Sequence, residues 1–255
     1  MLNCSTLDAL CFDQKKLNAD QKKEYKTKLQ KLESGIPMDY ILGRVKIGDL
    51  QLELSSKTLI PREETEHWVH RLNDLYKNTR TQTLVDLGCG CGLIGLSLAK
   101  NFQKVILVDI DLECVFIAQK NAWKNGIKNT EGLVSDRLSN LDPEIDNWSL
   151  VANLPYLPIS DKEFAERNNI SHEPDLALYS GRDGLDLFYR LILELKNFEN
   201  LPTTMCFELD CRNVFTAQMF LYRNLPAYMS MVQFDVNGFD RFLECRLRLE
   251  CSFGV

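Results

Sequence analysis

A glycine-rich turn near the middle of the chain has the residue types needed to hold a ligand against the backbone. It reads Asp86-Leu87-Gly88-Cys89-Gly90-Cys91-Gly92 and directly follows a short apolar run. Glycine has no Cβ, so the backbone can approach a ligand closely, and a helix that starts after the turn would present its free N–H groups there. The turn therefore predicts a cofactor site at the end of a strand.

The acids around this turn indicate which cofactor it holds. A dinucleotide site has the form G-x-G-x-x-G and binds a pyrophosphate, whereas this turn has the form G-x-G-x-G with Asp86 two residues before it. A carboxylate there repels a pyrophosphate and favours a cationic sulfonium, and Asp109, at the end of the next apolar run, can accept both ribose hydroxyls. We therefore expect S-adenosylmethionine. A nucleotide-binding oxidoreductase is the alternative, as is turn capping for Asp86.

The segment Asn153-Leu154-Pro155-Tyr156 follows another apolar run and is similar to the N-P-P-Y loop of methyltransferases that act on planar nitrogen. An amide nitrogen is a poor nucleophile because its lone pair is delocalised. The Asn153 side-chain oxygen and the Leu154 carbonyl can hold both of its N–H groups and stabilise positive charge on it. Tyr156 can pack on the flat group. A plain Asn-x-Pro turn is the alternative.

Histidine and cysteine do not form a metal-ligand pattern. The chain has three histidines, and Cys89 and Cys91 have no further ligands near them in the sequence. We therefore expect no metal site and interpret these two cysteines as small loop residues. Nine irregularly spaced cysteines in 255 residues do not make a disulfide scaffold, which favours a reducing, intracellular compartment.

Strands and helices alternate from residue 83 onward, and this alternation predicts an α/β fold: a Rossmann-like, doubly wound, mostly parallel sheet. Both motifs lie at carboxyl ends of strands, where such sheets bind ligands. The last two strands predict an antiparallel hairpin at the sheet edge. The predicted strands are 83–87, 104–109, 132–134, 149–152, 204–208, 228–235 and 241–249. Three helices are predicted between them: one that starts near residue 93, one that follows the strand 104–109 and ends at residue 125, and one over 184–198.

The first 79 residues have a different pattern. Residues 1–33 are predicted to be helical and to stop at Ser34-Gly35-Ile36-Pro37, which is typical of a helix end. Alternating apolar residues over 45–54 predict a β-hairpin, and acids in the first turn support a helix over 63–76. We therefore divide the chain into an N-terminal helical region with a hairpin linker, 1–79, and a catalytic domain, 80–255.

Composition argues against several functions. The chain is 45% hydrophobic and 26% charged with a net charge of -6, which is typical of a globular protein and argues against a broad nucleic-acid-binding surface. No apolar run approaches the ~18–20 residues needed to cross a membrane. The first residues lack a secretion signal and contain none of the arginine typical of a mitochondrial transit peptide.

Several further segments resemble one family in the order in which they occur. The chain is similar to the HemK/PrmC family, the N5-glutamine methyltransferases of peptide-chain release factors. The matching segments are Tyr40-Ile41-Leu42-Gly43, Leu59-Ile60-Pro61-Arg62-Glu63-Glu64-Thr65-Glu66, Ser135-Asp136, the tetrapeptide that starts at Asn153, His172-Glu173-Pro174, Ala177-Leu178, Asp183-Gly184-Leu185 and Asn237-Gly238-Phe239-Asp240-Arg241. They extend over about residues 36–245.

The resemblance implies methyl transfer from S-adenosylmethionine to the glutamine side chain in the Gly-Gly-Gln motif of a release factor, by a monomer. From the net charge and the short apolar runs we expect no contact with nucleic acid or membrane. It implies that the N-terminal region helps to grip the release factor. The cofactor positions are Asp86, Gly88, Gly90, Gly92, Asp109, Asp136 and Asn153; the catalytic ones are Asn153, Leu154, Pro155 and Tyr156; the substrate-lining ones are Pro61, Arg62, Glu64 and Thr65.

This chain departs from the family at three places. Only about 35 residues precede the Y-I-L-G element, Leu154 replaces a proline, and Asp210 and Asn213 stand where the family tends to have Gly and Gln. Two alternatives therefore stay open: a ribosomal RNA adenine dimethyltransferase, which would need a basic face, and a non-catalytic partner protein of the same fold. We expect a mitochondrial enzyme, with the cytoplasm as the alternative.

Overall fold

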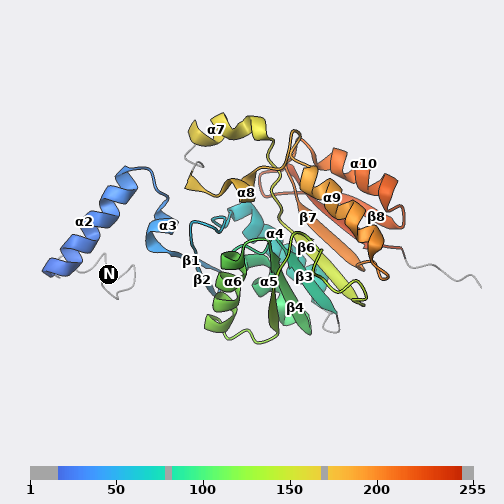
Figure 1. Ribbon diagram of the computed structural model, residues 1–255, viewed down its shortest axis with the longest axis horizontal. Coiled ribbons are helices and arrows are strands. Elements are labelled where there is room, and N and C mark those ends of the chain that lie inside the picture. Colours follow the sequence, from blue (N-terminus) through green and yellow to red (C-terminus); the bar gives the residue numbers. More distant parts are fainter. Residues whose placement is uncertain (1–16, 78–81, 168–171, 249–255) are drawn as a thin grey trace, which may run out of the picture.

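A twisted sheet with helices on both faces forms the body of the protein, and one N-terminal helix projects from it (Figure 1). The structure is a computed structural model that describes residues 17–77, 82–167 and 172–248. Residues 1–16 of the predicted helical segment 1–33 lie outside these ranges, and so does the predicted domain boundary between residues 79 and 80.

Seven strands form the main sheet in the order β5-β4-β3-β6-β7-β9-β8. The first five are parallel, whereas β9 pairs antiparallel with both β7 and β8. The predicted fold class is therefore confirmed. The strands are β3 (Thr83–Leu87), β4 (Lys104–Asp109), β5 (Thr130–Val134), β6 (Trp148–Ala152), β7 (Thr204–Glu208), β8 (Tyr228–Phe234) and β9 (Asp240–Leu247).

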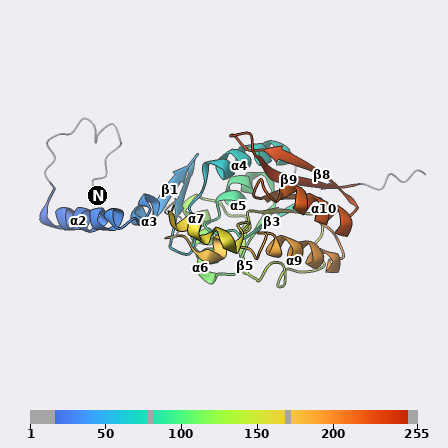
Figure 2. The ribbon, with the colours of Figure 1, turned by 90° about the horizontal axis from the view of Figure 1, so that it is seen from above.

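Two apolar cores cover the two faces of the sheet, because its central strands bury side chains on both sides. One core contains residues of α4, α5 and α6, and the other contains residues of α9 and α10. Figure 2 shows α4 and α9 on opposite sides of the sheet. The helices are α4 (Glu63–Tyr76), α5 (Leu93–Leu98), α6 (Leu112–Lys124), α9 (Asp186–Glu194) and α10 (Val214–Asn224).

Helices account for most differences from the prediction. The predicted helix 184–198 is the shorter α9 followed by a 3₁₀ turn, Leu195–Asn197, and α10 was not predicted. The helical period of α10 is hidden because Phe215, Met219 and Tyr222 are apolar yet more than half exposed. Three short helices were not predicted either: α3 (Met38–Leu42), α7 (Lys162–Arg167) and α8 (Asp175–Leu178).

The N-terminal helix α2 (Ala19–Glu33) is stabilised mainly by its own ends. Asn18 and Gln21 form a capping box, in which each side chain accepts from the other residue's backbone N–H, an arrangement that satisfies two orphan donors. None of its residues is buried. The helix therefore depends little on the sheet for packing.

The predicted hairpin is present as β1 (Arg44–Ile47) and β2 (Leu50–Glu53). Two asparagines hold the edge of β2, Asn121 in α6 and Asn125 at its C-terminal cap. Asn121 pairs with the backbone N–H and C=O of Glu53 at 2.8 and 3.1 Å. Asn125 pairs in the same way with Gln51, at 3.0 and 2.9 Å. This clasp fixes the hairpin against α6, beside the site described next.

Candidate active site

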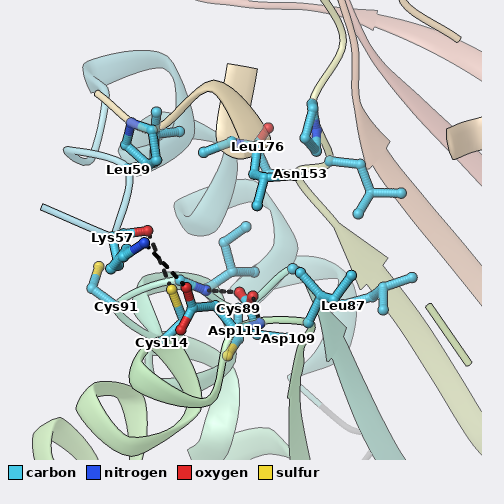
Figure 3. A pocket seen from close by; sticks show the side chains of 18 of the residues that line it. Lys57, Leu59, Leu87, Cys89, Cys91, Asp109, Asp111, Cys114, Asn153 and Leu176 are labelled. Carbon is cyan, nitrogen blue, oxygen red and sulfur yellow. Dashed lines mark hydrogen bonds and ion pairs between the residues drawn. The ribbon is translucent and has the colours of Figure 1, made fainter. Parts of the chain in front are cut away.

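A cavity of about 220 Å³ opens at the carboxyl ends of β3, β4 and β6 (Figure 3). This is the sheet edge where the sequence places its motifs. Residues far apart in the chain meet here. Of the predicted site residues, those that line it are Pro61, Arg62, Thr65, Gly88, Gly90, Asp109, Asp136, Asn153, Leu154 and Pro155. Asp86, Gly92, Glu64 and Tyr156 are not among its lining residues.

Asp109 and the glycine turn are locked together at one end of the cavity. The Asp109 carboxylate accepts the N–H of Gly90 and the N–H of Asp111, both at 3.0 Å. Burial raises the pKa of Asp109, and these N–H groups oppose the rise. Each carboxylate oxygen keeps a free lone pair. The carboxylate can therefore still accept hydroxyl groups from the cavity.

Gly88 brings the glycine turn against the loop formed by residues 153–156, the predicted catalytic loop. Its φ is +72°, a left-handed conformation that favours glycine. A Cβ at this position would lie 3.2 Å from Cδ2 of Leu154 and 3.7 Å from the Asn153 carbonyl oxygen. Leu154 also packs against the core on the α9 side of the sheet. Leu154, which replaces a proline of the family pattern, is therefore held by packing on the cofactor turn.

Asp86 is turned away from the cavity. Its Oδ2 accepts the N–H of Gly95 in α5 at 2.8 Å, and the residue is 1% exposed. Its Oδ1 is buried with no hydrogen-bond partner, and burial raises the pKa of the carboxyl to about 7. Asp86 thus ties the turn to α5, as the capping alternative expected. It does not line the cavity as a direct cofactor ligand would.

Gly92 also serves packing, because a Cβ there would lie 3.1 Å from Cβ of Ala118 and Cδ1 of Leu96. It begins α5 at a φ of +87°, so the glycine lets α5 start beside α6. On the cavity wall, Asp136 is 55% exposed at its side chain and pairs with Arg137 at 2.7 Å. Asp136 is thus positioned to meet a ligand, whereas Gly92 is not.

The Asn153 side chain faces the cavity from the end of β6 (Figure 3). Its Nδ2 donates to Oγ1 of Thr65 at 3.3 Å. Tyr156 instead directs its hydroxyl to Glu208, at 3.3 Å. Burial and the Glu208 charge raise the pKa of Tyr156. The Tyr156 hydroxyl therefore supports the loop through Glu208, while packing of its ring on a substrate stays a prediction.

The segment that starts at Pro61 lines the cavity and also contacts the chain that follows residues 153–156. Arg62 donates to both carboxylate oxygens of Glu173 at 2.8 Å. Burial raises the pKa of Glu173, and Arg62 opposes this rise. One nitrogen of Arg62, Nη2, makes both of these charge-assisted bonds, and they tie the start of α4 to the segment that contains Glu173. Glu64 lies off the cavity, where the side chain of Asn237 donates to it at 3.5 Å.

Sequence reasoning gave no role to three residues that hold the predicted catalytic loop: Glu208, Asn213 and Gly184. Glu208 binds Thr65 and Tyr156, and Asn213 donates to the backbone oxygens of Tyr156 and Asp183 at 3.2 and 3.3 Å. A Cβ on Gly184 would lie 2.1 Å from the Tyr156 oxygen. The available signal was the position of Glu208 at the carboxyl end of a predicted strand.

Three cysteines line the cavity: Cys89, Cys91 and Cys114. All are buried free thiols, and burial raises the pKa of each, that of Cys91 to about 12. They are thus neutral, polarisable wall residues. Within residues 17–77, 82–167 and 172–248, no group of three or more His, Cys, Asp or Glu could hold a metal ion.

This donor set fits a nucleoside-bearing sulfonium. The carboxylates of Asp109 and Asp136 supply acceptors for hydroxyl and amino groups, and the glycine turn supplies a close backbone. The sulfur and aliphatic walls suit a flat base and exclude water.

Comparison with known proteins gives the same picture. Residues 69–170 match the model of the methyltransferase small domain. The chain is 31% identical over 218 residues to the release factor glutamine methyltransferase of Deinococcus radiodurans, covering 83% of this chain and 74% of that protein. It is 30% identical over 247 residues to that of Flavobacterium psychrophilum, covering 91% and 83%.

Solved structures agree at the level of fold. The catalytic domain of hMettl16, solved with an RNA hairpin, has a TM-score of 0.60 at 16% identity and covers 84% of this chain and 81% of that one. A ribosomal protein methylase from Lactobacillus delbrueckii subsp. bulgaricus has a TM-score of 0.53 at 18% identity, covering 78% and 86%. In the described parts of the chain, every helix is too short or too polar to span a bilayer.

Proposed function

Because the chain belongs to the release factor glutamine methyltransferase (HemK/PrmC) family, we propose that it methylates the side-chain nitrogen N5 of the glutamine in a release factor's Gly-Gly-Gln motif. The observation that carries this proposal is the position of Asn153, which reaches the same cavity as the Asp109 carboxylate. One cavity can then hold a methyl donor and a planar nitrogen side by side.

The chain's own residues act by orientation and electrostatics. The Asn153 side-chain oxygen and the Leu154 carbonyl accept the two N–H groups of the substrate amide. They aim its nitrogen and stabilise the positive charge that grows on it. The methylated nitrogen is acidic enough to lose its proton to water, so the proposal requires no general base.

The cofactor is S-adenosylmethionine, which supplies the methyl group. Asp109 would accept the ribose hydroxyls, Asp136 would lie beside the adenine, and Gly88 and Gly90 would let the backbone approach. Asp86 and Gly92 would act on the cofactor indirectly, because they hold the glycine turn and α5 in place.

We assign the N-terminal region, residues 1–79, to contact with the release factor, and residues 80–255 to catalysis. The net charge of -6 favours a protein glutamine over an RNA adenine as the planar nitrogen. A monomer is sufficient for this activity. The named relatives are bacterial and give the mitochondrial prediction no support, so the compartment stays a prediction.

The test is transfer of a radiolabelled methyl group into a recombinant release factor, followed by peptide mapping. Label should appear in the peptide with the Gly-Gly-Gln motif and should be absent when glutamate replaces that glutamine. The intact release factor should be a better substrate than a short peptide, because the loop must be presented in its folded shape. Label in ribosomal RNA and none in the glutamine would contradict the proposal.

A further inference from the structure

Glu208 is a buried carboxylate that the proposed mechanism does not use. It ends β7, is 2% exposed and does not line the cavity. One of its oxygens accepts the hydroxyl of Thr65 at 2.8 Å, and the other accepts the hydroxyl of Tyr156 at 3.3 Å. A carboxylate is costly to bury unless it is paired. Glu208 is paired with two hydroxyl groups, and one of them, that of Thr65, is in contact with Asn153.

The groups around Glu208 shift its pKa in both directions, and burial is the largest effect. Burial raises its pKa and Glu64 adds to the rise, whereas Thr65, Tyr156 and the positive charge of Arg241 oppose it. Arg241 is itself held by Asp235 at 3.2 Å. The carboxylate therefore lies among two donors and a fixed cation.

The chemistry of the groups fixes the direction of the hydrogen bonds. The Thr65 hydroxyl donates to Glu208 at 2.8 Å, so its single proton is used on that bond. The Thr65 oxygen then offers only lone pairs, and Nδ2 of Asn153 donates to it at 3.3 Å. A carboxamide has one NH₂ and one oxygen. With its NH₂ directed to Thr65, Asn153 has its oxygen free on the other side.

We propose that Glu208 is a positioning residue that orients the Asn153 carboxamide through the hydroxyl of Thr65, so that the Asn153 oxygen faces the substrate amide. The inference rests on the proposed function. If the Thr65 hydroxyl were free to donate, it could bond the Asn153 oxygen and reverse the carboxamide. The asparagine would then present NH₂ to the NH₂ of the substrate, and two donors cannot pair.

The test compares Thr65→Val, Thr65→Ser and Glu208→Gln in methylation of an intact release factor. Thr65→Val removes the linking hydroxyl, and Glu208→Gln keeps the size but supplies a donor. Each should lower kcat by ~10–100-fold, with the KM for release factor and the Kd for S-adenosylmethionine within ~3-fold of wild type. Thr65→Ser keeps the hydroxyl and should retain kcat to within ~3-fold.

A double variant, Thr65→Val with Glu208→Gln, should lose no more than the worse single variant, because both break one chain of hydrogen bonds. Thr203→Val is the matched control. It removes a hydroxyl that donates to the Trp148 oxygen at 3.1 Å, just before β7, and should leave kcat unchanged. Melting temperatures of all variants report folding. If Thr65→Val does not fold, Glu208→Gln and Thr65→Ser decide the question.

Three outcomes would overturn the inference: wild-type kcat in Thr65→Val or Glu208→Gln, additive losses in the double variant, or an equal loss in Thr65→Ser and Thr65→Val. A wild-type protein that fails to label the glutamine would overturn the proposed function instead. The two failures can be distinguished, because the variants test the role of Glu208 only if the wild-type protein methylates the glutamine.

Discussion

Asn153 is the side chain on which the proposed chemistry depends most directly. Asn153→Ala removes an acceptor that acts on the nitrogen, and leaves the glycine turn and Asp109 intact. We expect turnover to fall by at least ~100-fold while the affinity for S-adenosylmethionine stays within a few-fold. Single-turnover methylation and cofactor titration measure the two quantities separately. Near-normal turnover would argue against the role of this loop.

The buried carboxyl of Asp86, which has one unpaired oxygen, should make the stability of the fold depend on pH. The pKa of this group is raised by burial from its ordinary value of 3.8 to about 7 in the folded protein. Between those values the folded state binds more protons than the unfolded state, so the contribution of Asp86 destabilises the fold as pH rises from about 4 to about 7. Above about 7 it changes no further.

Asp86→Asn keeps an acceptor for the Gly95 N–H and removes this titration. The free energy of unfolding of the variant, relative to wild type, should rise from pH 4 to pH 7 by up to roughly 4 kcal/mol. Denaturant unfolding without cofactor, at a series of pH values, measures this difference. Parallel curves for the two proteins would show that Asp86 keeps an ordinary pKa.

At the scale of elements, the catalytic loop depends on a close approach between two chain segments. Gly184 and Gly126 share a left-handed φ, +82° and +71°. A Cβ on Gly184 would lie 2.1 Å from the Tyr156 oxygen, whereas a Cβ on Gly126 meets nothing within 4 Å. Alanine substitutions at the two glycines therefore distinguish the effect of backbone strain, which both share, from the effect of displacing the loop, which only Gly184→Ala has.

We expect Gly126→Ala to cost about 1 kcal/mol of stability and to leave methyl transfer unchanged. Gly184→Ala carries the same strain and must also push the loop carbonyl aside, so kcat should fall by ~10-fold or more. Thermal unfolding and steady-state kinetics on both variants make the comparison. Equal kinetics in the two proteins would mean that the loop tolerates the shift.

The elements that sequence predicted well are those whose pattern is local. The strands 83–87 and 104–109 and the helix 63–76 have the predicted bounds, because short apolar runs and a clear helical period specify them. The support of the site was not predictable in this way. The bond between Thr65 and Glu208 joins residues 143 positions apart. For Asp86, the sequence alone does not distinguish two roles, because an aspartate at this position could either contact a cofactor or cap the following helix.

At the scale of the whole molecule, α2 and α3 present an apolar groove away from the cavity. The groove has a volume of about 320 Å³ and is lined by Tyr25, Leu29 and Leu32 among others. Leu29 is 39% exposed, and no residue of α2 is buried. Under the proposed function this surface meets the release factor, because it lies in the region assigned to that contact.

Leu29→Glu should therefore raise the KM for an intact release factor by ~5–10-fold and leave the KM for a short Gly-Gly-Gln peptide unchanged. Gln30→Glu is the matched control: it adds the same side chain one position along, at a residue that does not line the groove. It should change neither KM. An equal effect of both substitutions would attribute the loss to charge alone.

The clasp between α6 and the hairpin has a consequence for how the molecule behaves in concentrated solution. The exposed side of an outer strand normally offers a row of unpaired N–H and C=O groups, which another chain can use to start a fibre or an aggregate. In β2 these groups of Gln51 and Glu53 are already paired with Asn125 and Asn121. Two side chains, one in α6 and one at its C-terminal cap, thus take the place of a neighbouring strand, and this side of the hairpin is closed to self-association.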